Sequence, residues 1–219
     1  MATRRRYDDG CSTAYALDLV GERWALLVVR ELLFGPKRFT DLRTGLPGAS
    51  PNVLSQRLRE LDESGVLVRR RLPPPAASWV YELTPWGRQL EHVVAALGRW
   101  GAQAPGERGD GPISVDSMML ALRSLYDPAL ADGLVADVLV SVGDDGFRAT
   151  TTPEGLRLAR EPVDRPDAVI RTDTVTLKDV VCGRRTPAEA VAAGSLAVSG
   201  DRAVAMRFLA SFPSPGPAA

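Results

Sequence analysis

Apolar positions in the first part of the chain recur at helical spacing, and turn residues separate the periodic segments. A period near 3.6 marks residues 11–20 and residues 22–34, and the second segment stops at Gly35-Pro36. Residues 40–44 give one or two further helical turns before a Gly-Leu-Pro-Gly turn at 45–48. This pattern predicts three short helices in succession.

The next segment, residues 50–65, is predicted to be a helix with a polar outer face. Its Ser-Pro start suits a capping residue and the first helical position, and Gly65 suits the left-handed turn that ends a helix. Three leucines fall on one buried stripe: Leu54, Leu58 and Leu61. The opposite face carries side chains that can bond base edges and phosphates, which predicts DNA binding.

Two β-strands, residues 66–71 and 79–83, are predicted to follow as a basic ribbon. Helix, short helix, turn, recognition helix and ribbon is the order of a winged helix-turn-helix. For DNA contact we expect Ser50, Asn52, Ser55, Gln56 and Arg59 on the helix, and Arg69, Arg70 and Arg71 on the ribbon. Arg57 is expected to pair with an acidic residue instead.

An apolar stripe follows the ribbon, on a helix that begins at Thr84-Pro85. Its members are Trp86, Leu90, Val93, Leu97 and Trp100, at spacings of four, three, four and three. Such a stripe exceeds what a small domain needs for its own core, and a winged helix that reads a two-fold operator needs a two-fold partner. We therefore expect a homodimer contact here. The alternative is that the stripe packs against the second half of the chain.

The second half is predicted to be a separate α+β domain. Three glycines and two prolines in residues 105–112 indicate a linker between residues 1–104, a DNA-binding and dimerisation domain, and residues 113–219. A helix around residues 118–125 precedes strands at 134–142, 147–152 and 156–160 and later at 168–173 and 196–200, with helices at 174–182, at 187–193 and after Asp201. This order predicts an antiparallel sheet covered by helices, so the fold class is α+β.

Charge is distributed unevenly between the two halves of the chain. The chain has 219 residues and no net charge, but residues 1–104 hold 15 Lys and Arg against 11 Asp and Glu, and residues 105–219 hold 12 against 16. The basic half is the one expected to meet nucleic acid. No apolar run approaches the roughly 20 residues that cross a bilayer, so we expect a cytoplasmic protein without a membrane partner.

Several motifs in the first half closely resemble the HxlR family of bacterial winged-helix regulators, over about residues 8–103. They are the segments Leu17–Trp24, Arg38–Leu42, Leu54–Leu61 and Tyr81–Gly87, together with Cys11 and Gly65. The resemblance implies a homodimeric regulator of transcription, with the recognition helix in the major groove and the ribbon against the minor groove or the backbone. Two departures concern the DNA contacts: Asn52 stands where the family often has Lys or Arg, and Pro75–Ser78 lacks the usual ribbon-tip arginine.

The two cysteines, Cys11 and Cys182, cannot form a disulfide framework or a zinc site by themselves, and we expect both thiols to be buried. Redox sensing through the cysteine at this position occurs in some HxlR relatives. An oxidant-responsive regulator that uses Cys11 is therefore an alternative to a ligand-responsive one.

Residues 113–212 resemble, more loosely, the sterol-carrier-protein-like domain, through the order of elements and through Pro166–Asp173 and Ala192–Asp201. The resemblance implies an apolar tunnel between sheet and helices for a fatty or polycyclic molecule. Apolar side chains that could line it are Met118, Met119, Leu122, Phe208 and Leu209. The alternative is that these residues are ordinary core.

Together these observations predict a dimeric DNA-binding regulator whose affinity for double-stranded DNA changes with a small apolar ligand. A lipid carrier or scaffold is the second class, and salt-dependent DNA binding would exclude it. An enzyme is not expected, because His92 is the only histidine and has no nucleophile or metal ligand at useful spacing. No metal or cofactor is expected either.

Overall fold

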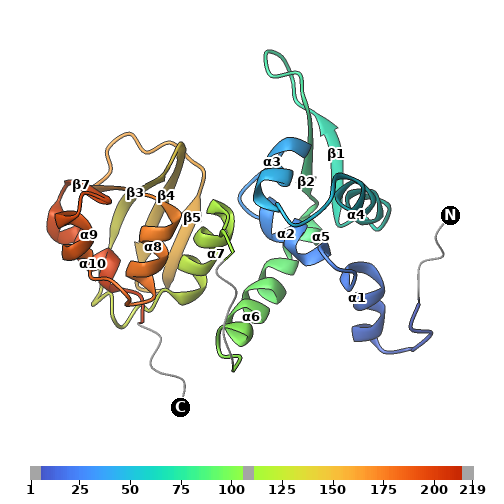
Figure 1. Cartoon of the computed structure of the whole chain (residues 1–219), viewed down its shortest axis with the longest axis horizontal. Helices are drawn as coiled ribbons and strands as arrows, with labels where there is room; N and C mark the ends of the chain where they lie inside the picture. Colours follow the sequence, from blue (N-terminus) through green and yellow to red (C-terminus); the bar gives the residue numbers. More distant parts are fainter. Residues whose placement is uncertain (1–5, 106–110, 214–219) are drawn as a thin grey trace. The chain divides into compact units, whose positions relative to one another are not determined.

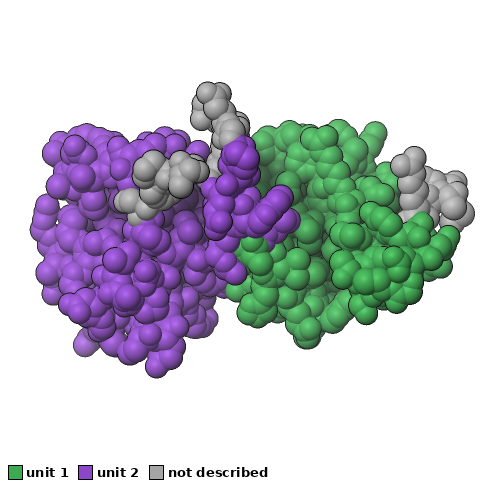
Figure 2. Space-filling model, turned by 90° about the horizontal axis from the view of Figure 1, so that it is seen from below, with its two compact units in different colours: residues 1–96 green, residues 97–219 purple. Residues whose placement is uncertain are grey.

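The computed structural model describes residues 6–105 and 111–213 and divides the chain into two compact units, residues 1–96 and 97–219 (Figures 1 and 2). The predicted linker includes residues 106–110, which lie outside the described residues, so the domain limits 1–104 and 113–219 stay predictions. No helix in the described ranges combines the length and the apolar character that crossing a membrane requires.

The first unit has the predicted order of elements, except that the single helix expected from Thr84-Pro85 is divided at Gln89 into two helices. The elements are α1 (Ser12–Val20), α2 (Ala25–Leu32), α3 (Phe39–Gly45), α4 (Pro51–Glu63), β1 (Leu67–Arg71), β2 (Trp79–Leu83), α5 (Pro85–Arg88) and α6 (Leu90–Ala102). Strands β1 and β2 pair antiparallel, with Leu67 opposite Leu83 and Arg71 opposite Trp79. α6 continues from the first unit into the second. Three helices, a recognition helix and a two-stranded wing make this a winged helix-turn-helix.

One predicted helix begins later than its periodicity suggested. Residues 22–34 read as a single helix, but α2 starts at Ala25 because Trp24 has a left-handed backbone with φ 77°. A bulky residue at positive φ is unusual, and it interrupts helical geometry. The guanidinium of Arg23 lies 5.2 Å from the centre of the Trp24 ring.

A buried carboxylate organises the interior of this unit. Glu31 on α2 has no solvent exposure, and its two oxygens accept hydrogen bonds from Arg30, at 2.9 and 3.2 Å, and from Lys37, at 2.9 Å. The backbone of Lys37 in turn exchanges hydrogen bonds with that of Tyr81 on β2. The last residue of α3, Gly45, lies against the same carboxylate, and a Cβ atom there would approach Glu31 Oε2 to 2.2 Å.

The second unit is the expected α+β layer. Its elements are α7 (Val115–Leu125), β3 (Ala136–Val142), β4 (Asp145–Thr152), β5 (Gly155–Ala159), β6 (Ala168–Thr172), α8 (Thr174–Val181), α9 (Pro187–Ala192), β7 (Leu196–Gly200) and α10 (Arg202–Ala210). The strand order is β5-β4-β3-β6-β7, and the sheet is antiparallel except where β3 and β6 run parallel. The parallel pair was not foreseen, because periodicity gives strands but not their partners.

Burial alternates along β3, so one face of this sheet is covered and the other is open. On the covered face α7 contacts β5, and α10 contacts β6 and β7. Arg160 donates to the buried Asp116 of α7 at 2.7 Å and to Asp145 of β4 at 2.8 Å, and its guanidinium lies 4.5 Å from the ring centre of Phe147. This ion cluster therefore ties α7 to the sheet.

Because Gly45 packs against Glu31, replacing this glycine by alanine should destabilise the protein, the opposite of the usual effect in a helix. Alanine normally stabilises a helix relative to glycine by about 0.5–1 kcal/mol. Gly45→Ala should instead lower the free energy of unfolding by about 1–3 kcal/mol, because the new methyl group displaces a buried, hydrogen-bonded carboxylate. Urea unfolding measures the change. The matched control is Gly98→Ala in α6, where a Cβ meets no atom within 4 Å and the ordinary stabilisation is expected. Equal effects at the two positions would show that the close approach has no energetic weight.

Candidate DNA interface

Helix α4 is built as the sequence predicted, with a capped start and a polar outer face. Ser50 Oγ accepts a hydrogen bond from the backbone N–H of Val53 at 3.4 Å, and Pro51 occupies the first turn. Leu54, Leu58 and Leu61 are buried. Asn52, Gln56 and Arg59, at spacings of four and three, lie along the opposite and exposed stripe, and Ser55 is exposed on its flank. We call Asn52, Gln56 and Arg59 the reading stripe.

Arg57 is turned away from the reading stripe, as expected. It is buried, and its guanidinium makes an ion pair with Glu60 and another with Glu22, the latter at 3.6 Å. The carboxylate of Glu60 also accepts a hydrogen bond from Gln56 Nε2 at 3.0 Å. A chain of polar contacts therefore runs from Glu22 through the buried guanidinium to the reading stripe.

The structure separates three wing arginines that the sequence left equivalent. The Arg69 guanidinium lies 4.6 Å from the ring centre of the half-exposed Trp79, in a cation–π contact. Arg70 Nε donates to Glu82 at 2.5 Å, and Glu82 also pairs with Arg88. Arg71 Nε donates at 3.2 Å to a backbone carbonyl of the wing loop. Arg70 is thus partly neutralised, whereas stacking leaves the charge of Arg69 and its in-plane N–H donors available.

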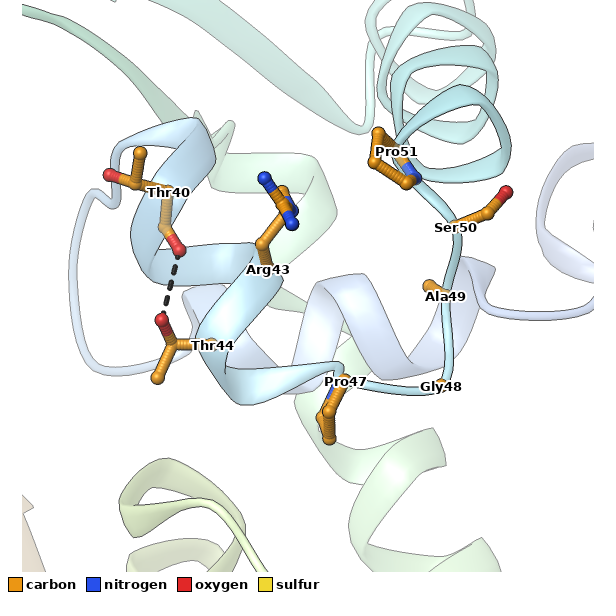
Figure 3. A pocket seen from close by; sticks show the side chains of 8 residues that line it. All are labelled: Thr40, Arg43, Thr44, Pro47, Gly48, Ala49, Ser50 and Pro51. Atoms are coloured by element: carbon orange, nitrogen blue, oxygen red, sulfur yellow. Dashed lines mark hydrogen bonds between the residues drawn. The ribbon is translucent and has the colours of Figure 1, made fainter.

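A hollow of about 770 Å³ lies between α3 and the start of α4 (Figure 3). Its lining comes from α3, the following turn and the cap of α4: Thr40, Arg43, Thr44, Pro47, Gly48, Ala49, Ser50 and Pro51. In Figure 3 the Arg43 side chain extends into the space between α3 and Pro51. Arg43 is exposed and makes no hydrogen bond or ion pair within the described residues. Sequence reasoning missed it, because one arginine in a short helix forms no pattern.

Most residues of the expected dimer stripe are exposed. Trp86, Val93 and Leu97 are about half exposed and Trp100 is 72% exposed, whereas Leu90 is only partly exposed. The five residues expected to line a ligand tunnel, Met118, Met119, Leu122, Phe208 and Leu209, are all buried in the second unit. Ordinary core residues and residues that line a ligand-filled tunnel would both be buried, so their burial is compatible with either alternative.

The expectation that both cysteine thiols are buried is wrong. Cys11 is exposed because it is the residue just before α1, and Cys182 is half-buried because it follows the last turn of α8. The backbone N–H groups of Ala14 and Thr13 lower the pKa of the Cys11 thiol, since partial positive charge at a helix start favours the thiolate.

Comparison with known proteins agrees with this architecture. Residues 19–108 match the HxlR-like helix-turn-helix family, and residues 130–212 match the SCP-2 sterol transfer family. The HTH-type transcriptional regulator YvaP of Bacillus subtilis is 35% identical over 88 residues, which are 40% of this chain and 82% of YvaP. An HTH-type regulator of Mycobacterium tuberculosis, Rv3095, is 42% identical over 93 residues, 42% of this chain and 58% of the relative. The reduced form of YodB from B. subtilis, a solved structure, is 33% identical over 44% of this chain and 98% of YodB, with a TM-score of 0.40.

The fold and the exposed face of α4 define a DNA-binding protein of the winged helix-turn-helix class, joined to a sterol-carrier-like α+β unit. The chain belongs to the HxlR family of transcriptional regulators. These relatives are regulators of transcription and not enzymes.

The different surroundings of Arg69 and Arg70 predict different salt effects. Arg69→Ala should weaken binding to all DNA sequences alike and lower the slope of log affinity against log salt by about 0.9, the share of one phosphate contact. Arg70→Ala is the matched control on the neighbouring position, and its slope should change by less than half as much, because Glu82 already occupies that guanidinium. Fluorescence anisotropy over a salt series gives both slopes. A larger loss for Arg70→Ala than for Arg69→Ala would reverse the assignment.

Proposed function

We propose that this chain is a homodimeric regulator that binds operator DNA through its winged helix and whose affinity for it changes with a small apolar ligand. The observation that carries the proposal is the reading stripe, which lies exposed on a capped helix in the same unit as an arginine-rich wing. Amide and guanidinium groups in this arrangement can bond base edges in the major groove. Ser50 and Ser55 supply further hydroxyl groups on the same helix.

The wing and the hollow supply the sequence-independent part of the interface. Among the described residues no acidic side chain pairs with Arg69 on the wing or with Arg43 beside the start of α4, so both charges are available. Phosphate contacts of this kind fix the register of a protein on the duplex. Arg71 supports the wing loop, and Arg70 contributes less because of its acidic partner.

A second copy of this chain is the proposed partner of the stripe on α5 and α6. Exposed tryptophan and aliphatic side chains at helical spacing are typical of an interface rather than of a solvated helix. A two-fold dimer would also present two reading stripes to the two halves of an operator.

Leu97→Arg should therefore convert the dimer to a monomer at micromolar concentration, because it places a charge in an apolar interface. Sedimentation velocity measures the state. Val175→Arg is the control, since Val175 is exposed at the start of α8, outside the stripe, and that variant should stay dimeric. A wild-type protein that sediments as a monomer at this concentration would contradict the dimer proposal.

The second unit is the proposed ligand-binding part. Its residues 130–212 match the SCP-2 sterol transfer family, and two adjacent buried methionines on α7 give adaptable apolar walls. The hydroxyl oxygen of Tyr126 is buried and makes no hydrogen bond of normal geometry within the described residues. Burial raises the pKa of this side chain, and the nearby Thr151 side chain opposes that rise. An apolar ligand with one hydrogen-bonding oxygen, such as a sterol or a fatty acid, would satisfy that hydroxyl group.

Ligand binding can change DNA affinity only if the ligand prefers one spacing of the two reading stripes. Helix α6 is the proposed route, because it starts in the winged-helix unit, ends in the second unit and carries part of the dimer stripe.

Tyr126→Phe should lower the affinity for a ligand without lowering the stability of the fold. Removing a buried hydroxyl group that makes no hydrogen bond of normal geometry should leave thermal stability unchanged or slightly higher, while affinity for a fluorescent sterol or fatty acid should fall about tenfold. Anisotropy of DNA from upstream of the protein's own gene, with and without the same ligand, measures the response. Ligand that binds wild type and Tyr126→Phe equally would contradict the role of the hydroxyl group, and selective DNA binding that ignores every such ligand would leave the second unit structural.

Oxidant sensing through Cys11 is the second candidate for regulation, and the exposure and lowered pKa of this thiol favour it. Oxidant that releases DNA equally from wild-type protein and from Cys11→Ser would exclude it.

A further inference from the structure

Within the reading stripe, the side chain of Gln56 is oriented by a hydrogen bond to another side chain of the same helix. Its amide nitrogen lies 3.0 Å from Glu60 Oε1, one helical turn further along α4. The other oxygen of Glu60 accepts from the buried guanidinium of Arg57. Glu22, ahead of α2, pairs with the same guanidinium.

The chemistry of this contact decides which way the Gln56 amide faces. A carboxylate engaged with a guanidinium can only accept hydrogen bonds, so the NH₂ group of Gln56, and not its carbonyl oxygen, must be the group that faces Glu60. The opposite orientation would place two acceptors against each other. Gln56 therefore presents its Oε1 acceptor and one remaining N–H donor to the outside.

One acceptor beside one donor matches adenine in the major groove. Adenine offers the N6 amino group as a donor and N7 as an acceptor, whereas guanine offers two acceptors, O6 and N7. Against guanine, Oε1 of an amide held in this orientation would meet O6 without a hydrogen between them. Rotating the amide to serve guanine would break the bond to Glu60 and leave its carboxylate facing the Gln56 oxygen.

We propose that Gln56 reads an adenine in each operator half-site, and that Glu60 is the positioning residue that fixes this preference. Arg57 holds Glu60 in place, so the preference originates in the interior of the winged-helix unit. This inference rests on the proposed DNA binding and names the base that the same interface selects. If the contact between Gln56 and Glu60 only stabilised the helix, its removal would not change the preference for a base. The positioning role and the purely structural role therefore predict different results when bound DNA is selected.

Selection of bound duplexes from a randomised library, with the full chain, tests the proposal. Wild-type protein should enrich a two-fold motif with one position at which adenine exceeds guanine by about ten- to hundredfold, and Gln56→Ala should lose the preference at that position alone. Glu60→Gln should lower the ratio of adenine to guanine at least fivefold, because a side-chain amide can accept or donate and so releases the orientation of Gln56. Glu63→Gln is the matched control on the same helix, and it should keep the wild-type ratio.

A modified duplex keeps the test valid if Glu60→Gln unfolds. Replacing the selected adenine by purine, which lacks the 6-amino group, should weaken wild-type binding about tenfold and leave Gln56→Ala unaffected. A selected motif whose Gln56-dependent position prefers guanine, or a Glu60→Gln protein that folds and keeps the wild-type ratio, would overturn the inference while DNA binding stands. Absence of any selected motif would overturn the proposed function, and the inference with it.

Discussion

The buried carboxylate of Glu31 is the contact on which the winged-helix unit depends. An ion taken out of water costs several kcal/mol unless it is paired and hydrogen-bonded, and removing one partner of such a pair costs about 3–5 kcal/mol. Arg30 and Lys37 pair with the Glu31 carboxylate. The backbone of Lys37 is also hydrogen-bonded to that of Tyr81, which links this pair to strand β2 of the wing. Since Gly45 closes over the same carboxylate, one group fixes α2, the end of α3 and the base of the wing together.

The positions of acidic side chains distinguish the arginines of the winged-helix unit from one another. Glu60 and Glu22 pair with the buried Arg57, and Glu82 partly neutralises Arg70, whereas Arg43 and Arg69 have no acidic partner among the residues that the structure describes. Charge composition showed that this half of the chain is basic. The distribution of the partners decides where that charge is available, and this is a property of surfaces brought together by folding.

In the second unit, too, a buried carboxylate paired with a basic side chain connects two elements, here a helix and the sheet. Asp116, almost fully buried on α7, binds Arg160, which also pairs with Asp145 and covers Phe147. On the other face of the sheet, hydrogen bonds from Arg148 and Thr150 lower the pKa of Asp137 to about 2, so the carboxylate keeps its charge, and its pair with Arg148, until the pH falls toward 2. The covered face is mainly apolar. The buried Thr151 hydroxyl group on this face is hydrogen-bonded to the backbone of Ala136, whereas the buried Tyr126 hydroxyl group makes no hydrogen bond of normal geometry within the described residues.

Local patterns in the sequence predicted most of the helices and strands, because helical and strand periodicities and turn residues depend on nearby residues: the cap at Ser50, the stripe of α4, the wing and the strands of the second unit were all predicted. They also placed Gln56 and Arg59 on the outer face. Features that depend on partners distant along the chain could not be predicted in this way, namely the parallel pairing of β3 and β6 and the difference between Arg69 and Arg70. The left-handed backbone of Trp24 and the exposure of Cys11 were not predicted either. A periodic pattern shows which face of a segment is buried. Only the folded chain brings a particular partner side chain against each residue, and in this protein such partners orient the side chains proposed to read DNA.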